Sequence, residues 1–250
     1  MITNVYEYPN FLIVLIILSC IVNGEVTIGE EKRLRIDPNN QNRYDDAVVP
    51  LIIGGRDAPK GDFEDIVCGI VGSNGFGHYC GCTIIAPDVA LSAAHCYFPE
   101  FTVGDFVEIG KYYRDKDNKK NKNVFKLRIT EVILNKKYSN RASSGYDIMV
   151  LKLEKEYPKP PVTLQLTKKQ WSEEDEFTVV GWGTTKPDNF NKLAKKLQSV
   201  DVNYVDFKTC EKFWKSKQIP SLKTYFCAYS KGKDSCAGDS GGPIFTKVSI

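Results

Sequence analysis

Histidine is nearly absent from this chain, since only His78 and His95 occur among its 250 residues. A structural zinc site needs cysteine and histidine ligands clustered at short, regular spacings. The eight cysteines are dispersed along the chain, and neither histidine lies in such a pattern. The sequence therefore argues against a zinc-binding protein, and any chemistry that requires an imidazole base has only two candidates for it.

The sequence also lacks an apolar run long enough to span a membrane as a helix. The run at residues 11–22 is shorter than the roughly 20 residues of a membrane-spanning helix, and it has the length of a secretory signal core. Small residues permit cleavage before Glu25, although Glu7 and the lack of a preceding Lys or Arg are unusual for a signal. We expect residues 1–24 to be a signal peptide of a secreted, extracellular protein, with a membrane anchor as the alternative.

Aromatic and apolar residues are scarce again in residues 25–51, so this segment lacks the surface needed to pack a core. The 199 residues from Ile52 onward are enough for a sizeable core. We therefore expect the folded domain to span residues 52–250.

Short apolar runs between turn signals dominate this domain and predict an all-β fold. Apolar residues at helical spacing predict one helix at 205–216, and the prolines within 157–161 mark a linker that cannot continue a central strand. The predicted strands lie at 66–71, 83–85, 89–92, 106–109, 125–129, 148–153, 177–180 and 197–202.

Ser240 lies in a glycine-rich segment, Asp-Ser-Cys-Ala-Gly-Asp-Ser-Gly-Gly-Pro at 234–243. Glycines allow a tight turn and bring backbone N–H groups close to a ligand. A serine hydroxyl is a weak nucleophile until a neighbouring base removes its proton. Taken alone the segment is an ordinary turn, and it becomes a candidate site only if the chain also supplies a base and an acid.

His95, in Leu-Ser-Ala-Ala-His-Cys, is the candidate base, and Asp147, directly before the apolar run at 148–153, is the candidate acid. Each residue also has a simpler interpretation, because a histidine beside a cysteine is often structural and an aspartate before a strand is often a turn residue. The combination of His95, Asp147 and Ser240 in this order favours catalysis.

These three motifs resemble those of the chymotrypsin-like (trypsin family) serine proteases, over residues 52 to about 245. The resemblance implies two antiparallel Greek-key β-barrels, at about 52–160 and about 161–250, with the active site in the cleft between them. Further matching segments are Ile-Ile-Gly-Gly at 52–55, Val-Gly-Trp-Gly at 180–183 and Tyr-Phe-Cys at 225–227.

The resemblance implies a monomeric serine endopeptidase that cleaves protein or peptide substrates without a cofactor and is a target of protease inhibitors. Ser240 would attack the scissile carbonyl, His95 would accept its proton and pass it to the leaving amine, and Asp147 would orient the imidazole. The N–H groups of Gly238 and Ser240 would form the oxyanion hole.

Asp234 lies six residues before Ser240, where trypsin-like members carry the acid at the base of their specificity pocket. A buried carboxylate favours a cationic partner, so the resemblance implies cleavage after Arg or Lys. The alternative is a surface aspartate beside Lys233. His78 has no catalytic role in this comparison, although in the family a histidine at this place can contact the acid next to the serine.

Residues 25–51 correspond to a propeptide in this comparison. In the family, a cut before the isoleucine frees an α-amino group that pairs with the acid next to the serine, and these residues are Ile52 and Asp239 here. Leu51 stands where the family usually has Arg or Lys. We therefore expect an activating protease of chymotrypsin-like specificity, or no activation, rather than self-activation.

The cysteines divide into three groups by this resemblance. Cys68 and Cys82 lie outside the usual family positions and could bridge one hairpin, and Cys236 is left over because its family partner would lie beyond Ile250. The implied disulfides, which suit a secreted protein, are Cys80–Cys96 and Cys210–Cys227.

Much of the excess positive charge lies at residues 111–126, within a domain of 30 basic and 24 acidic residues. Such a run can attract nucleic acid or anionic surfaces, but a solvated hairpin loop is the favoured interpretation and we expect no nucleic-acid partner. In the family this region can hold a calcium ion between glutamates. No Glu occurs between Glu108 and Glu131, so we expect no metal there.

The sequence ends ten residues after Ser240, whereas the family continues through the last strands of the second barrel, one wall of the pocket and a closing helix. We expect a fragment of a full protease or, alternatively, a truncated form with an incomplete second barrel. The alternative to an enzyme is a non-catalytic homologue that acts as a binding cofactor or decoy. Such proteins usually lose a triad residue, and all three are present here.

Overall fold

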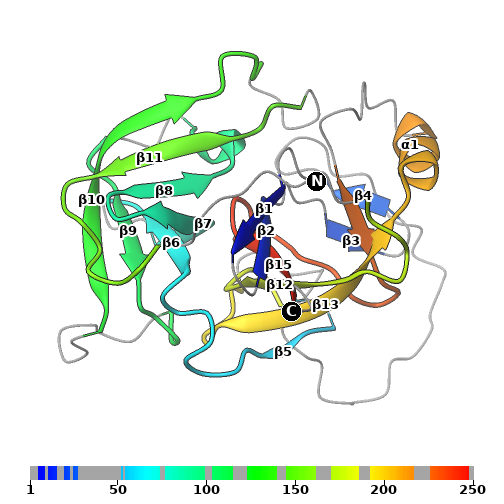
Figure 1. Cartoon of the computed structure of the whole chain (residues 1–250), viewed down its shortest axis with the longest axis horizontal. Helices are drawn as coiled ribbons and strands as arrows, with labels where there is room; N and C mark the ends of the chain where they lie inside the picture. The colour runs from blue at the N-terminus through cyan, green and yellow to red at the C-terminus, as the bar shows by residue number, and fades with distance from the viewer. Residues whose placement is uncertain are drawn as a thin grey trace.

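The structure is a computed structural model that describes most of the domain and, near the N-terminus, the backbone of four short strands. Within this part of the chain it is nearly all-β, with two antiparallel units side by side (Figure 1). The described residues are 5–8, 11–15, 20–22, 25–27, 52, 54–73, 77–98, 103–114, 123–139, 145–161, 170–185, 192–216 and 226–247.

The first unit is a closed barrel of six strands in the order β10-β11-β8-β7-β6-β9. Closure pairs every strand on both sides, so the barrel leaves no open edge. Its buried interior includes Ile70, Ile84, Val107 and Leu151. The strands are β6 (Val67–Val71), β7 (His78–Ala86), β8 (Val89–Ser92), β9 (Phe106–Ile109), β10 (Phe125–Leu134) and β11 (Met149–Leu153).

The second unit is a seven-stranded sheet in the order β1-β2-β15-β12-β13-β14, with β5 also paired to β13. Apolar side chains from β12, β13 and β15 pack against Ile52 and Phe226 in its core. The strands are β1 (Val5–Tyr8), β2 (Phe11–Leu15), β5 (Arg56–Asp57), β12 (Glu176–Gly181), β13 (Gln198–Val205), β14 (Cys227–Tyr229) and β15 (Pro243–Lys247).

The N-terminal part of the chain contributes to this second sheet. Strand β2 pairs antiparallel with β15, from Phe11 opposite Lys247 to Leu15 opposite Pro243. Strands β3 (Cys20–Val22) and β4 (Glu25–Thr27) form a separate pair. Part of the segment that we predict to be a signal core, Phe11–Leu15, is therefore a strand of the second sheet in the uncut chain, and its removal stays a prediction.

The one α-helix of the described residues, α1 (Phe207–Ser216), follows β13. It begins two residues later than predicted because Val205 is still paired with Cys227 in the sheet. Asp206 caps the helix, since one carboxylate oxygen accepts the N–H groups of Lys208 and Thr209 at 2.9 and 3.1 Å. Among the described helices, none has the length and apolarity that a bilayer crossing requires.

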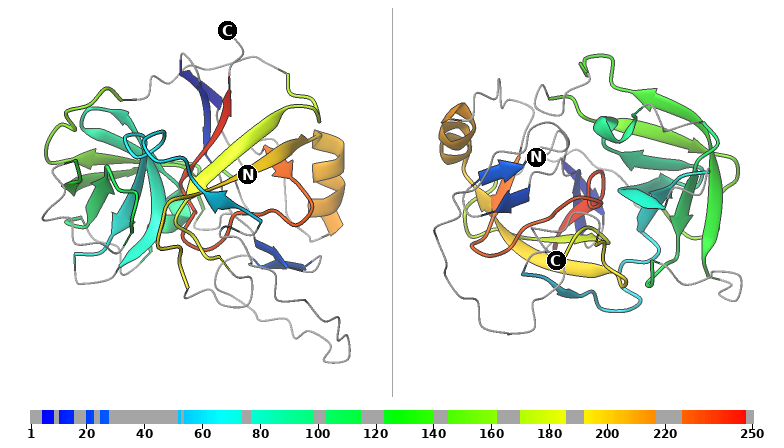
Figure 2. Two further views of the ribbon diagram at one scale, coloured as in Figure 1. Left: turned by 90° about the horizontal axis from the view of Figure 1, so that it is seen from below. Right: turned by 180° about the vertical axis from the view of Figure 1, so that it is seen from behind.

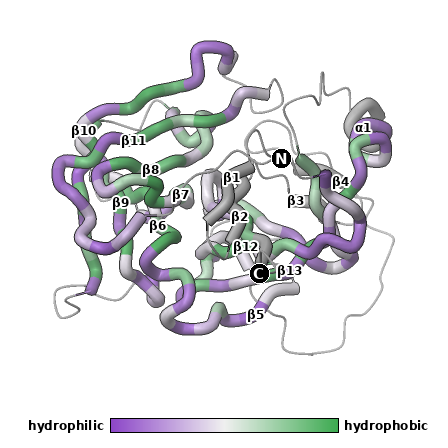
Figure 3. The backbone as a smooth tube through the Cα atoms, viewed as in Figure 1, coloured by the Kyte–Doolittle hydropathy of each residue, from purple (hydrophilic) through white to green (hydrophobic). Residues whose placement is uncertain are grey.

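The all-β fold predicted from the sequence is confirmed, and every predicted strand is present. Strand β10 is longer than predicted because its second half pairs with β11 after a register shift between Ile129 and Glu131. Hydrophobic residues follow the barrel strands, while the connecting loops and α1 are largely hydrophilic (Figure 3). Two further views show that the segment leading into β15 runs between the barrel and the second sheet (Figure 2).

Candidate active site

His95 and Asp147 are brought together by two neighbouring strands of the barrel. His95 lies in the 3-10 helix η1 (Ala94–Cys96) just after β8, and Asp147 precedes β11. Because β8 and β11 are paired antiparallel with Met149 opposite Ser92, the end of one strand lies beside the start of the other. This pairing brings the carboxylate of Asp147 and the imidazole of His95 next to each other.

Asp147 holds His95 by two hydrogen bonds. Its side chain is fully buried; one carboxylate oxygen accepts the backbone N–H of His95 at 2.7 Å, and the other lies 2.6 Å from Nδ1 of the ring. A proton on Nδ1 satisfies the second contact and leaves Nε2 as the proton acceptor. The histidine side chain is 26% exposed, so the imidazole is reachable from outside.

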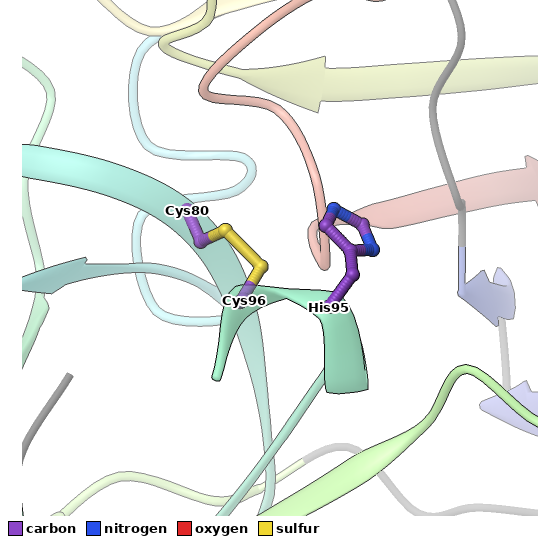
Figure 4. A group of neighbouring side chains, drawn as sticks. All are labelled: Cys80, His95 and Cys96. Carbon is purple, nitrogen blue, oxygen red and sulfur yellow. A yellow bond between two sulfur atoms is a disulfide. The ribbon is translucent and has the colours of Figure 1, made fainter. Parts of the chain in front are cut away.

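Ser240 lies in the turn before β15, next to the histidine segment. Its carbonyl oxygen accepts the N–H of Gly81 at 2.7 Å and lies 3.7 Å from Sγ of Cys96. Figure 4 shows the ring of His95 beside the segment that leads into β15. Among the described residues no hydrogen bond joins the Ser240 hydroxyl to His95, and such bonds are often long until substrate is bound.

Gly238 adopts φ 92°, a conformation that favours glycine. A Cβ at this position would lie 2.7 Å from Cδ2 of Leu193, so packing and backbone both require glycine. In the described part of the chain, neither Gly238 nor Ser240 uses its N–H in a hydrogen bond. Both donors are therefore available to an external acceptor, as an oxyanion hole requires.

His78 is hydrogen-bonded to the same turn, to Gly238 rather than to the acid next to the serine that the family resemblance suggested. Its Nε2 lies 2.8 Å from the carbonyl oxygen of Gly238, and its ring meets Trp182 edge-on with centroids 5.7 Å apart. Burial lowers the pKa of His78 to about 4, against the opposing effect of the Gly238 hydrogen bond. The imidazole is thus neutral at physiological pH and donates its Nε2 proton to this carbonyl.

Asp239 is buried in a cradle made by two glycines. Its carboxylate accepts the N–H of Gly183 at 2.6 Å and the N–H of Cys236 at 3.1 Å. A Cβ at Gly181 or Gly183 would overlap this carboxylate, which explains glycine at both positions. Burial raises the pKa of Asp239 to about 7, and no neighbouring cation lowers it.

Ile52 is buried in the core of the second sheet, while its nitrogen is a peptide N–H because the chain is uncut. The two residues expected to pair after activation are both buried, and no ion pair between Ile52 and Asp239 is present among the described residues. Gly54 packs so closely against the carbonyl of Gly232 that a Cβ would overlap it. The segment after Ile52 therefore lies against the loop that leads to Asp234.

Asp234 is half-buried in that loop, six residues before Ser240. One carboxylate oxygen accepts the N–H of the following residue, Ser235, at 2.8 Å. The chain reaches this position through a tight turn in which Ser230 is bridged to Lys233. A role for Asp234 in substrate selection stays a prediction.

The disulfides largely follow the predictions. Cys236 is itself disulfide-bonded, so the prediction that it is left over was wrong. That prediction considered only the pairing usual in the family, whereas any two cysteines of suitable geometry can form a disulfide in an oxidising environment. The bridges among the described residues are Cys80–Cys96, Cys210–Cys227 and Cys68–Cys82.

The ligand atoms of Cys80, His95 and Cys96 lie within 4.8 Å of one another (Figure 4). A cysteine must be a thiolate to bind a metal ion, and here the sulfurs of Cys80 and Cys96 are bonded to each other. This group is therefore a disulfide beside the imidazole and has no thiolate to offer a metal.

A closed β-barrel beside a second antiparallel sheet, with a His–Asp pair and a serine turn where the two meet, is the architecture of the chymotrypsin-like serine proteases. The model of the trypsin family matches residues 52–249. The chain therefore belongs to the trypsin family, and the resemblance seen in its motifs is confirmed.

Several proteases are similar to the chain over most of its length. Hypodermin-B of Hypoderma lineatum is 30% identical over 195 residues, which cover 77% of this chain and 72% of that protein. Trypsin theta of Drosophila melanogaster is 28% identical over 232 residues, covering 92% and 82%. Venom serine protease 34 of Apis mellifera is 32% identical over 203 residues, covering 77% and 48%.

Proposed function

We propose that the protein is a secreted serine endopeptidase in which Ser240, His95 and Asp147 form the catalytic triad. The observation that supports this most strongly is the double hydrogen bond from buried Asp147 to His95, because it fixes both the tautomer and the orientation of the imidazole. The contact of the Ser240 carbonyl with Cys96, the residue after His95, also supports the proposal.

In the proposed reaction, Ser240 Oγ attacks the scissile carbonyl while Nε2 of His95 takes its proton. The tetrahedral oxyanion accepts hydrogen bonds from the N–H groups of Gly238 and Ser240, each worth about 3–4 kcal/mol. His95 then protonates the leaving amine, and water repeats the sequence on the acyl-enzyme. The carboxylate of Asp147 stabilises the imidazolium.

We further propose that Asp234 selects Arg or Lys on the acyl side of the cleaved bond. Its position six residues before Ser240 supports this, since a carboxylate in a partly desolvated loop favours a cationic side chain. Substrates are then proteins or peptides with an accessible Arg or Lys, and protease inhibitors that present such a residue are expected partners.

Activation is proposed to require a cut before Ile52. The pKa of Asp239, raised to about 7 by burial, supports this because no cation among the described residues of the uncut chain lowers it. A new α-amino group at Ile52 would supply that cation. Leu51 at the cut favours an activator of chymotrypsin-like specificity, acting on a secreted precursor after loss of residues 1–24.

Fluorophosphonate labelling tests the triad directly, because an activated serine oxygen attacks the phosphorus of the probe, displaces fluoride and becomes phosphonylated, whereas an unactivated serine does not react. The secreted protein is expected to be labelled once its N-terminus is Ile52, and Ser240→Ala and His95→Ala are expected to abolish the signal. Heat-denatured protein serves as the control for non-specific reaction. Equal labelling of the wild type and Ser240→Ala would refute the triad.

A binding protein without catalysis is the second candidate. It is favoured by the lack, among the described residues, of a hydrogen bond between the Ser240 hydroxyl and His95. This candidate predicts a folded protein with an N-terminus at Ile52 that takes up no fluorophosphonate, so the same experiment separates the two functions.

A further inference from the structure

The Cys68–Cys82 disulfide joins two residues that lie directly opposite each other in strands β6 and β7. Both side chains are fully buried in the barrel core, and their Cα atoms are 4.8 Å apart. It is additional to the two bridges that family resemblance implies. It differs from those two bridges in linking residues that are directly paired in neighbouring strands.

The next pair in the same ladder is Gly69 opposite Gly81. A pair of glycines has no side chains to pack across the strands, so the ladder is weakly held at this point. A slip of one residue would turn every side chain of the strand to the other face. The neighbouring disulfide forbids that slip because it ties residue 68 to residue 82 covalently.

Both glycines are required by what lies over them. The ring of His78 lies over Gly69, where a Cβ would come within 3.0 Å of its Cε1 atom, and the backbone of Gly242 lies 2.8 Å from a Cβ at Gly81. Larger side chains, which would fix the register of β6 against β7, therefore do not fit at Gly69 and Gly81. The covalent link between Cys68 and Cys82, beside this pair, fixes the register instead.

Gly81 is also hydrogen-bonded to the backbone of Ser240, the proposed nucleophile. Its N–H donates to the carbonyl of Ser240 at 2.7 Å, and its own carbonyl accepts the hydroxyl of Ser92 at 2.8 Å. On its other side, Cys80 is bonded to Cys96, the residue after His95. One peptide on β7 is thus connected to the nucleophile turn and to the histidine segment.

We propose that the Cys68–Cys82 disulfide is a positioning device for Ser240. It fixes the register of β6 against β7 at the glycine pair and so keeps the Gly81 N–H on the Ser240 carbonyl. Loss of the disulfide lets β7 shift relative to the nucleophile turn, which moves Ser240 with respect to His95. The proposal rests on the proposed function of Ser240 as the nucleophile.

A general stabilising role is the competing explanation, since any disulfide constrains the unfolded chain. The Cys210–Cys227 bridge provides a matched control. Its sequence separation of 17 is close to the 14 of Cys68–Cys82, so the two links restrict unfolded chains of similar length. It fastens α1 to β14, and neither element contributes a residue to the candidate site.

The first experiment compares Cys68→Ala/Cys82→Ala with Cys210→Ala/Cys227→Ala, using the rate of fluorophosphonate labelling well below both unfolding temperatures. Both variants are expected to lose a similar amount of Tm. Only the first is expected to be labelled more slowly, by at least about tenfold, because displacement of a reacting atom by about 1 Å can cost about 100-fold. Equal labelling rates in the two variants would overturn the proposal.

The second experiment does not depend on activity. In Ser240→Ala, residue 240 keeps its carbonyl, so the hydrogen bond from Gly81 can still form, and exchange of the Gly81 amide with deuterium reports on it. Adding Cys68→Ala/Cys82→Ala is expected to speed this exchange, and adding Cys210→Ala/Cys227→Ala is not. Unchanged exchange would overturn the proposal even if the wild type were never labelled.

Cys68→Val/Cys82→Ala provides a second variant if the double alanine does not fold, because valine restores buried volume and suits a strand. It is expected to recover Tm without recovering the labelling rate or the Gly81 protection. Recovery of all three together would show that the bridge acts only by filling the core.

Discussion

At the residue scale, Asp147 acts on His95 through two separate hydrogen bonds, one to the backbone and one to the ring. Asp147→Asn keeps the size of the side chain but offers only one acceptor oxygen, so the ring loses its enforced tautomer. We expect kcat on a peptide amide to fall by about 10⁴, the loss typical of this triad in the family. Thermal unfolding of the variant checks that the fold is retained, and kcat within tenfold of wild type would contradict the assigned role.

Gly238 offers a test of the oxyanion hole. Gly238→Ala combines a strained φ of 92° with overlap on Leu193, so the N–H of residue 238 must move. We expect kcat to fall by about 10²–10³. Gly61→Ala is the matched control, because Gly61 has φ 101° but nothing within 4 Å of a Cβ. It should cost about 1–2 kcal/mol of stability and leave kcat unchanged; equal losses of kcat would show a general effect of strain.

Asp234 decides the proposed preference for basic residues. Asp234→Ser removes the carboxylate from a loop that is also held by hydrogen bonds of Ser230 and Asp239 and by the disulfide of Cys236, so the fold is expected to survive. We expect kcat/KM for Arg and Lys ester substrates to fall at least 100-fold, while that for an uncharged aromatic ester does not fall. A preference unchanged by the substitution would assign Asp234 to the surface of the loop.

At the scale of elements, the predictable part of the fold was the part with regular patterning. The runs at 89–92 and 106–109 match β8 and β9 to the residue because apolar residues there lie between clear turns. The short strands β5 and β14, of 2 and 3 residues, carry too few side chains to show a period. They exist because β13 offers a neighbour on the folded sheet, which a local pattern does not contain.

The same limit applies to the site. His95, Asp147 and Ser240 could be predicted because each lies in a recognisable local motif. The contact between His78 and Gly238 could not, because it joins residues 160 apart in sequence through packing over Gly69. Family resemblance pointed to a contact of His78 with the acid next to the serine, Asp239, whereas the structure pairs it with the carbonyl of the preceding residue, Gly238.

Helix α1 gives a prediction at this scale. Asp206 caps its first turn by accepting the N–H groups of Lys208 and Thr209. The side chain of Thr209, followed by the backbone N–H groups of Thr209 and Lys208, holds the pKa of Asp206 below its usual range. Asp206→Ala is expected to lower the free energy of unfolding without changing kcat, because α1 contributes no residue to the candidate site. Denaturant unfolding measures the loss, and Asp206→Asn, which also caps, should restore most of it.

At the scale of the whole molecule, two buried groups give the uncut chain opposite responses to pH. The pKa of Asp239 is raised to about 7 by burial, so between about pH 4 and 7 the folded chain binds more protons than the unfolded chain, and stability falls as pH rises. The pKa of His78 is lowered to about 4 by burial. Between about pH 4 and 6.5 the unfolded chain therefore binds more protons at this site, and stability rises with pH.

Asp239→Asn removes the pH response of Asp239 and leaves that of His78, so comparing the two proteins isolates the contribution of Asp239. In the Ser240→Ala background, which prevents self-cleavage, the stability of the Asp239 protein relative to the Asn variant is expected to decline from pH 4 to 7. The steepest decline should be about 1.4 kcal/mol per pH unit. Denaturant unfolding at a series of pH values measures the difference. A cut before Ile52 should abolish the decline, because the new ammonium group lowers the pKa of Asp239; a difference that never varies with pH would contradict the assignment.

The pairing of β2 with β15 joins the segment Phe11–Leu15 to the strand that follows Ser240. If residues 1–24 are removed, the 5 residues of β15 lose the outer neighbour that they have in the uncut chain, immediately downstream of the turn that holds Ser240. Unpaired peptide groups of this kind attract any extended strand that fits. If residues 1–24 are removed as proposed, the strand that follows Ser240 therefore keeps β12 on one side and exchanges β2 for another partner, or for water, on the other.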